Sequence, residues 1–278
     1  MALVVNTNMN ALTIENTLSA TNNKVSSSLK KLSSGLRINS AADDPAGYAI
    51  ANSFKSAISS MTVASQNASE AESMLEVADG AYSTINDILE QMKTLATEAS
   101  SGQESQTNLD SLNAEFSDLQ NEINLIAKST TYGSTHLIDG TNSTATSGIT
   151  FQIGATNSSN DQITIKFDTA TTSCLGVSSI SIDSQTTAES AMDAIDSALT
   201  SINTYMGSVG GLTNQLTYTV TNLTTSIQNY TSSESTIEDV DMASEVSTLT
   251  KNEILQQSAT AMLAQANSQP QQILKLLS

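Results

Sequence analysis

Apolar side chains recur at alternating spacings of four and three residues, without a miss, between Ile50 and Ala99. This is the period at which helices wrap around one another in a coiled coil. One helix over that range would be about 75 Å long, which leaves little room for it in a compact domain. The sequence therefore predicts an elongated helical rod. The series consists of Ile50, Phe54, Ala57, Met61, Ala64, Ala68, Ala71, Leu75, Ala78, Tyr82, Ile85, Leu89, Met92, Ala96 and Ala99.

The same period returns in two further segments, from Leu109 to Ile126 and from Ala188 to Tyr230. The other faces of all three segments carry mainly Ser, Thr, Asn and Gln. Three such helices can bury their apolar stripes against one another and leave a polar outside. We therefore expect a mainly α fold, an elongated antiparallel helical bundle with coiled-coil packing.

The two chain ends carry apolar helical stripes and opposite charge. Residues 1–42 have a net charge of +3 and residues 237–278 a net charge of −3. Matching stripes and opposite charge predict that the terminal helices pair as a coiled coil, although two frayed terminal helices are the alternative. The residues expected to drive this self-assembly are Val4, Ala11, Leu18, Val25, Leu29, Leu32, Leu255, Met262, Leu263, Ile273, Leu274 and Leu277.

Local breaks suggest a domain organisation. Asp44 before Pro45 is a typical helix start, so residues 33–44 are expected to link a terminal domain (1–42 plus 237–278) to a rod domain (43–236). Between about 129 and 187 the apolar period changes to two, which predicts a β-hairpin insert that packs on the bundle. Val177, Ile180 and Ile182 are expected to add a further strand.

Composition excludes several functions. A net charge of −18 argues against binding to nucleic acid or to an anionic membrane surface. No run of about 18 apolar residues suggests insertion into a bilayer. The N-terminal residues lack the basic and apolar regions of a secretory signal, so we expect synthesis in the cytosol and any export to proceed without a cleaved signal.

The chain offers little for catalysis. His136 is the single histidine, which excludes a site built on two histidines, and we expect it to lie in a loop. Cys174 lacks basic neighbours that would activate a thiol, and we expect it to pack as a small apolar residue. Asp43 and Asp44 are interpreted as helix-capping residues rather than cation ligands. No motif for nucleotide, metal or serine-nucleophile chemistry occurs, so no enzymatic activity, cofactor or metal is expected.

Two long motifs, one near each end, resemble those of bacterial flagellins. The first is Val-Asn-Thr-Asn-Met-Asn-Ala-Leu over 5–12, with Leu-Ser-Ser-Gly-Leu-Arg-Ile-Asn-Ser-Ala-Ala-Asp-Asp-Pro over 32–45. The second comprises Ile-Glu-Asp-Val-Asp-Met-Ala-Ser-Glu-Val over 237–246, Ile-Leu-Gln-Gln-Ser over 254–258 and Met-Leu-Ala-Gln-Ala-Asn-Ser-Gln-Pro-Gln-Gln-Ile-Leu-Lys-Leu-Leu over 262–277. The resemblance covers the chain outside roughly 140–187, which points to a short member without large outer domains.

The resemblance implies a structural subunit that polymerises into the flagellar filament used for motility, outside the cell. It implies paired terminal helices that line the filament channel, and a rod domain in the tube wall. Its implied partners are other copies of the chain, an export chaperone, the flagellar secretion apparatus, and junction and cap proteins. No binding of nucleic acid and no membrane insertion are implied.

In better-known flagellins a Toll-like receptor binds the rod domain, and the resemblance places that surface at Leu89, Gln91, Lys93, Leu95 and Glu115. Gln91 stands where well-recognised members have an arginine, so weak recognition is expected. Two other functions stay open: a hook–filament junction protein, which shares the N-terminal pattern, and a glycosylated surface adhesin, which the high Ser and Thr content would suit.

Overall fold

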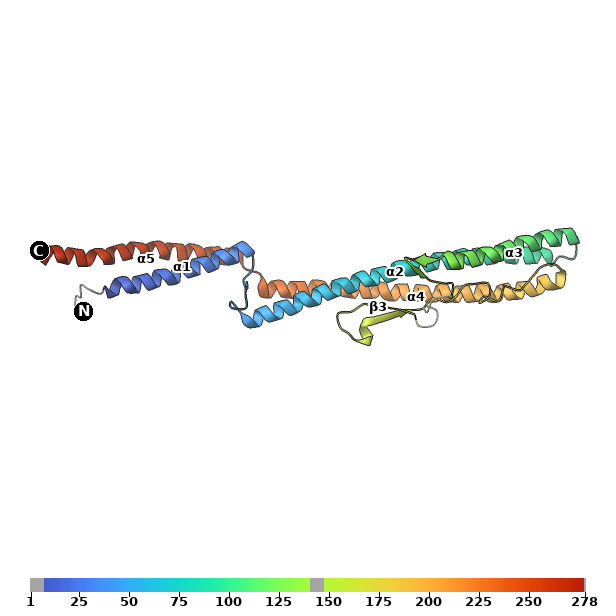
Figure 1. Cartoon of the computed structure of the whole chain (residues 1–278), viewed down its shortest axis with the longest axis horizontal. Helices are drawn as coiled ribbons and strands as arrows, with labels where there is room; N and C mark the ends of the chain where they lie inside the picture. The colour runs from blue at the N-terminus through green and yellow to red at the C-terminus, as the bar shows by residue number, and fades with distance from the viewer. Residues whose placement is uncertain (1–7, 141–147, 278) are drawn as a thin grey trace. The chain divides into compact units, whose positions relative to one another are not determined.

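The structure is a computed structural model that describes residues 8–140 and 148–277, the last of these (270–277) by their backbone alone. Long helices dominate it (Figure 1). In chain order the helices are α1 (Met9–Ser34), α2 (Pro45–Ala99), α3 (Gln106–Ser129), α4 (Gln185–Glu238) and α5 (Met242–Leu277). The chain divides into a terminal unit, residues 1–58 with 229–278, and a central unit, residues 59–228. Both α2 and α4 contribute residues to each unit.

The central unit contains the main core, and the predicted apolar series forms it. Every member of the α2 series from Met61 to Ala99 is buried, including Tyr82, Leu89 and Met92 with no exposed surface. Phe116 and Ile123 of α3 and Ile195, Ile202 and Leu216 of α4 belong to the same cluster. The predicted three-helix bundle is therefore confirmed, and α4 stays helical through Gly207, Gly210 and Gly211.

The predicted hairpin is formed by β3 (Ile149–Gln152) and β4 (Gln162–Ile165), which pair antiparallel with Ile149 opposite Ile165. A one-turn 3₁₀ helix, η1 (Ser159–Asp161), precedes β4. Ile163, Ile165 and Phe167 are buried in the core of the central unit, so the insert packs on the bundle as expected. The sequence did not indicate the short pair β1 (Thr131–Tyr132) and β2 (Thr135–His136).

The expected third strand is wrong. Within the described residues, the segment from Val177 to Ile182 forms no strand. Its backbone groups are instead bound by amide side chains of α3: Gln120 donates to the carbonyls of Val177 (2.7 Å) and Ile180 (3.0 Å), and Asn113 accepts from the N–H of Ile182 (2.9 Å). Because these side chains satisfy the backbone, no neighbouring strand is required.

In the terminal unit, α1 and α5 run side by side in opposite directions (Figure 1). Gly35 ends α1 in the left-handed conformation (φ 75°) and donates its N–H to Lys31. Asp44 begins α2 as predicted, because its carboxylate accepts from the N–H groups of Ala46 (3.1 Å) and Gly47 (3.0 Å). The terminal unit includes the first part of α2 and the last part of α4, and so extends beyond the expected 1–42 and 237–278.

Candidate functional site

The most buried positions of the seam between α1 and α5 carry small or polar side chains. They are Thr21, Ser28, Asn252 and Ala266, each less than a tenth exposed. Asn8 donates to the carbonyl of Ala266 (2.8 Å), and Gln256 donates to Asn22 (2.8 Å). The hydrogen bonds fix the alignment of the two helices, while small seam residues remove little apolar surface from water. The pairing of α1 with α5 alone is therefore weakly stabilised.

Several of the predicted self-assembly residues lie outside this seam. Ala11, Leu18, Val25, Leu32 and Leu263 are half-buried against the partner helix. In contrast, Leu29 is 50% exposed, Leu255 47% and Met262 58%, so these three side chains are uncovered in the single chain. Val4 and the side chains of Ile273, Leu274 and Leu277 lie outside the described part of the structure.

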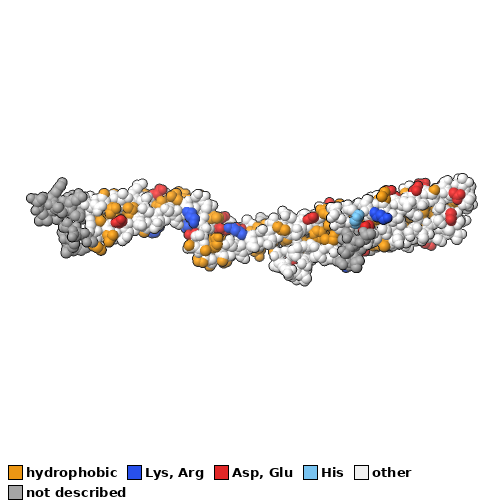
Figure 2. All heavy atoms as spheres, viewed as in Figure 1, with side chains coloured by type: hydrophobic (Ala, Val, Ile, Leu, Met, Phe, Trp, Pro, Cys, Tyr) orange, Lys and Arg blue, Asp and Glu red, His pale blue; other side chains and the backbone are white. Residues whose placement is uncertain are grey.

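Further apolar side chains are exposed on the same pair of helices. They include Met9 and Leu12 of α1 and Met242, Val246 and Ile254 of α5, all close to half exposed or more. Figure 2 shows hydrophobic side chains at the surface over this part of the molecule. A helix that is apolar on several faces is normally surrounded by other protein. The terminal pair is therefore the strongest candidate for a surface that binds other chains.

The segments that connect the terminal helices to α2 and α4 are bound to each other. Leu36 and Asp239 form an antiparallel β-bridge, in which the N–H of Arg37 donates to Glu238 (2.6 Å) and the N–H of Val240 donates to Gly35 (3.0 Å). We call these two connecting segments, 35–37 and 237–240, the clasp. The Arg37 guanidinium also donates to the carbonyl of Ile237 (2.5 Å). The clasp joins the end of α1 to the start of α5 through backbone hydrogen bonds.

A partly buried ion pair supports the clasp. The Glu238 side chain is 5% exposed and that of Lys55, on α2, is 45% exposed. Lys55 Nζ donates to Glu238 Oε1 (2.7 Å) and lies 2.6 Å from Oε2 without hydrogen-bond geometry, so that second contact is electrostatic. The hydrogen bond to Glu238 raises the pKa of Lys55. No local sequence signal connects two residues so far apart in the chain, and sequence reasoning missed this pair.

Charged groups at the start of α2 order the neighbouring connection. The Asp43 carboxylate accepts from the hydroxyl of Ser40 (3.0 Å) and from the N–H groups of Asn39 and Ser40. These hydrogen bonds lower the pKa of Asp43, and the bond from the Ser40 hydroxyl has the largest effect. The capping role expected from the sequence is therefore confirmed for Asp44 and wrong for Asp43, whose carboxylate binds groups of the turn before α2 and none of the first N–H groups of the helix.

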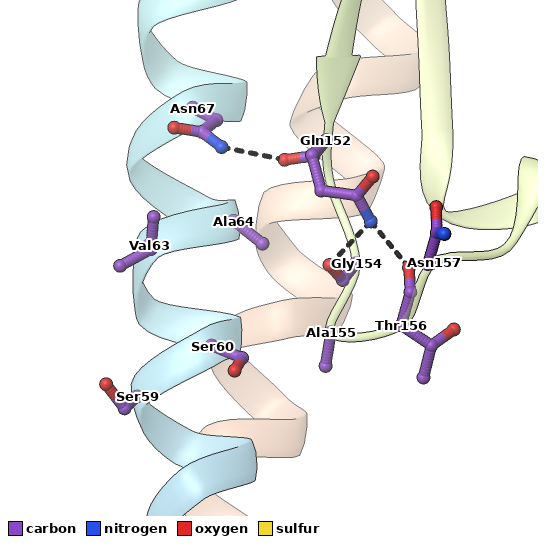
Figure 3. Close-up of a pocket in the computed structure, with 10 residues that line it drawn as sticks. All are labelled: Ser59, Ser60, Val63, Ala64, Asn67, Gln152, Gly154, Ala155, Thr156 and Asn157. Carbon is purple, nitrogen blue, oxygen red and sulfur yellow. Dashed lines mark hydrogen bonds between the residues drawn. The ribbon is translucent and has the colours of Figure 1, made fainter.

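The central unit has a surface hollow of about 430 Å³ between α2 and the loop that follows β3 (Figure 3). Val63, which is 52% exposed, and Ala64 line it on the helix side. Asn67 donates to the backbone carbonyl of Gln152 (2.9 Å), whose side chain in turn donates to the carbonyls of Gly154 and Thr156. These bonds hold the loop against α2, and the lining consists of amides, hydroxyls and small apolar groups.

The predicted receptor-binding residues are only partly at the surface. Gln91 and Glu115 are exposed and their side chains lie 3.5 Å apart, and Lys93 forms an ion pair with Asp196 (2.5 Å). Leu89 has no exposed surface and Leu95 has 8%. Both leucines belong to the core of the central unit, so their placement in an exposed surface is wrong.

His136 lies in a short hairpin, with Nδ1 2.9 Å from the carbonyl of Lys128 and 3.7 Å from the Asp139 carboxylate. Cys174 is exposed, which corrects the expected packing role: in the turn from Thr171 to Gly176 it is Leu175 that points into the core. Among the residues that the structure describes, no group of three His, Cys, Asp or Glu side chains is arranged to hold a metal ion. None of the described helices combines the length and apolar character needed to cross a bilayer.

Comparison with known proteins extends these observations to the whole chain. Residues 5–143 match the family model of the bacterial flagellin N-terminal helical region, and residues 192–277 match that of the C-terminal helical region. Flagellin of Bacillus subtilis is 35% identical over 98% of this chain and 99% of its own length. Flagellin FlaB2 of Treponema pallidum is 34% identical over 99% of this chain and all of its own length.

Two solved structures share the fold. The crystal structure of Bacillus cereus flagellin aligns with a TM-score of 0.51 at 30% identity, over 57% of this chain and 88% of that one. A putative flagellar hook-associated protein from Vibrio parahaemolyticus aligns with a TM-score of 0.58 over 70% of this chain and 99% of its own, but at 13% identity that likeness concerns the fold alone. Full-length relatives, both family models and the paired terminal helices agree: the chain belongs to the bacterial flagellin family and is a structural subunit of the flagellar filament.

Proposed function

We propose that the terminal helix pair is the element through which this subunit polymerises. The observation that carries the proposal is the set of half-exposed apolar side chains on α1 and α5, among them Leu12, Leu255 and Met262. Copies packed around this pair would remove these side chains from water, at about 25 cal/mol per Å² of apolar surface. The central unit needs no such cover for its core, because its apolar series is already buried.

Assembly of a full-length variant tests the proposal. Leu263 is half-buried in the seam, and Leu263→Asp would place a charge among apolar groups when copies pack around the pair. Short filament seeds in a sulfate salt, which strengthens apolar burial, should elongate with the wild-type chain and not with Leu263→Asp. Leu263→Met is the matched control and should elongate the seeds, because it keeps an apolar side chain of similar volume.

Electron microscopy and the helical content of the monomers give the readout. Long filaments from Leu263→Asp, with unchanged helical content, would contradict the role of the terminal pair. Wild-type chains that bind seeds only at one end and add no length would instead indicate a junction protein. Binding of target surfaces by chains that do not polymerise would indicate an adhesin.

We infer that the subunit leaves the cell through the flagellar secretion apparatus, without a cleaved signal, and is held before export by a chaperone that covers α5. Junction and cap proteins would then be its neighbours at the two ends of the filament. Exposed Val246, Ile254 and Leu255 support this inference, because an uncovered apolar helix favours premature association. Co-purification of a small cytosolic protein that is lost on Ile254→Asp would support the chaperone; unchanged co-purification would contradict a site on α5.

We also propose that a Toll-like receptor recognises the chain weakly. The exposed part of the expected surface offers Gln91 and Glu115, while Lys93 is engaged with Asp196. A neutral amide cannot form the bidentate ion pair that a guanidinium forms with a carboxylate. Gln91→Arg should therefore raise the response of receptor-bearing cells to endotoxin-free monomer. A full-strength response to the wild-type chain would refute the proposal.

A further inference from the structure

The α1–α5 pair has two flanks of opposite charge. On α1 the seam runs through Ala11, Ile14, Leu18, Thr21, Val25, Ser28 and Leu32, and on α5 through Glu245, Leu249, Asn252, Gln256, Ala259, Leu263 and Ala266. Both series alternate in steps of three and four residues, so the positions that border the seam follow from the heptad pattern.

Along one border of the seam lie Glu15, Asn22 and Leu29 of α1, seven residues apart. On α5 the equivalent border carries Val246, Glu253 and Thr260. In two antiparallel helices these equivalent borders meet on the same side of the pair. The hydrogen bond from Gln256 to Asn22 places this border beside the partner helix. We call these six residues the acidic flank.

The opposite border of the seam carries Thr17, Lys24 and Lys31 of α1, again seven residues apart. Its equivalent on α5 carries Thr248, Leu255 and Met262. This set, the basic flank, has two ammonium groups and no carboxylate, whereas the acidic flank has two carboxylates and no ammonium group. Each flank also presents two exposed apolar side chains, Leu29 and Val246 on the acidic flank and Leu255 and Met262 on the basic flank.

This segregation keeps the four charged side chains of the two flanks apart within one chain; Glu245 lies in the seam itself and belongs to neither flank. Across the described residues of the terminal unit, the only ion pairs join Lys55 to Glu234 and Glu238, and none connects α1 with α5. Glu15 and Glu253 lie on one flank, Lys24 and Lys31 on the other, so opposite charges point away from each other. The charges therefore remain for contacts outside the pair.

We propose that the basic flank of one copy binds the acidic flank of the next copy. The proposal rests on the filament-subunit function and names the surfaces that this assembly uses. Contact between two different surfaces of identical chains repeats from copy to copy and closes into a ring or continues as a helix. In such a contact Lys24 and Lys31 meet the carboxylates of the neighbour, and the exposed leucines, valine and methionine of the two flanks cover one another.

Charge reversal of one flank at a time tests this arrangement in the full-length chain. Variant A, Lys24→Glu with Lys31→Glu, has two acidic flanks; variant B, Glu15→Lys with Glu253→Lys, has two basic flanks. Seeded growth at low ionic strength, where surface charges are least screened, should be at least about tenfold slower for either variant alone than for wild type. An equal mixture of A and B should grow much faster than either, because unlike flanks then meet.

Two matched single substitutions test whether the position of the lysine, rather than the change in net charge alone, determines the growth rate. Lys30 and Lys31 are adjacent, but Lys30 lies on the outer face of α1 and belongs to neither flank. Lys31→Glu should slow growth, and Lys30→Glu should leave it within about twofold of wild type. Circular dichroism of each monomer, expected to match wild type, shows that slow growth does not come from loss of helix.

Three results would overturn the inference while leaving the filament function intact. In each of them wild-type chains still elongate the seeds. The first is wild-type growth by both A and B; the second is equal slowing by Lys30→Glu and Lys31→Glu. The third combines two observations: the mixture of A and B elongates seeds slowly, and the chain that carries all four changes elongates them at the wild-type rate. Together these would show that the charges pair within one chain. Failure of wild-type chains to elongate seeds would instead contradict the proposed function.

Discussion

The Lys55–Glu238 ion pair allows a direct test of how burial determines the strength of a charge contact. A second ion pair, Lys93–Asp196, has a similar separation of 2.5 Å but lies at the surface, with its carboxylate side chain 55% exposed compared with 5% for Glu238. Replacing either lysine by Met removes the charge and keeps most of the aliphatic stem. The two substitutions therefore differ chiefly in the carboxylate that they leave behind.

The expected costs follow from that exposure. Removing one partner of a fully buried ion pair costs roughly 3–5 kcal/mol, because the remaining charge is uncompensated. Lys55 is 45% exposed, so water already reaches its end of the contact, and we take about 2 kcal/mol for Lys55→Met. For Lys93→Met the exposed pair is worth about 0.5 kcal/mol.

Amide hydrogen exchange measured by mass spectrometry resolves the two units separately. In Lys55→Met, protected amides around 35–37 and 237–240 should exchange about thirty times faster, which corresponds to about 2 kcal/mol, while the central unit is unchanged. Lys93→Met should accelerate exchange in the central unit about twofold. The double variant Lys55→Met/Glu238→Gln should recover part of the loss, because no uncompensated charge remains.

Equal effects of Lys55→Met and Lys93→Met would refute this reasoning, since the carboxylates differ in burial. A double variant that is less stable than Lys55→Met would also refute it, because the remaining carboxylate would then not be the source of the cost.

Three further predictions concern single side chains. Leu89→Ala should destabilise the central unit by about 3 kcal/mol in urea unfolding, because Leu89 is fully buried; a loss under about 1 kcal/mol would contradict its place in the core. Asp44→Ala removes two hydrogen bonds at the start of α2 and should cost about 1 kcal/mol, seen as faster amide exchange at 46–50, whereas Asp44→Asn should cost little. Burial raises the pKa of Tyr82, so the folded chain keeps a proton that the unfolded chain loses near pH 10. The stability of the wild-type chain should therefore fall as pH rises above about 10, and the stability of Tyr82→Phe should fall less steeply; identical slopes would contradict the buried phenol. Tyr205, whose pKa burial also raises, and Lys55, whose pKa the hydrogen bond to Glu238 raises, contribute to the slope that remains.

Periodic segments could be predicted because each position in them repeats the same physical requirement. The α2 series from Met61 to Ala99 is buried throughout, and the helices, the hairpin and the Asp44 cap follow from local patterns. At the start of the same series the period did not predict burial, because Ile50 is 47% exposed. A period identifies an apolar face but does not show whether one chain can cover that face.

The terminal helices show where this inference stops. A stripe at seven-residue spacing identified half of the α1 seam, and the alternate positions Thr21 and Ser28 were missed although they are more buried than Leu18 or Val25. Continuing the steps of three and four from Ala11 would have found them. Opposite net charges of the two ends predicted attraction within the chain, yet Glu15 and Glu253 lie on one flank of the helix pair and Lys24 and Lys31 on the other.

The sequence by itself determined the helical rod, its hairpin insert and its family, since periodicity, turn residues and the two terminal motifs are properties of neighbouring residues. Only the tertiary structure decided which apolar residues are covered and that Lys55 reaches Glu238 across 183 positions of chain. The reason is that burial and charge pairing depend on the distance between segments that are remote in the chain. That distance is set when the whole chain folds.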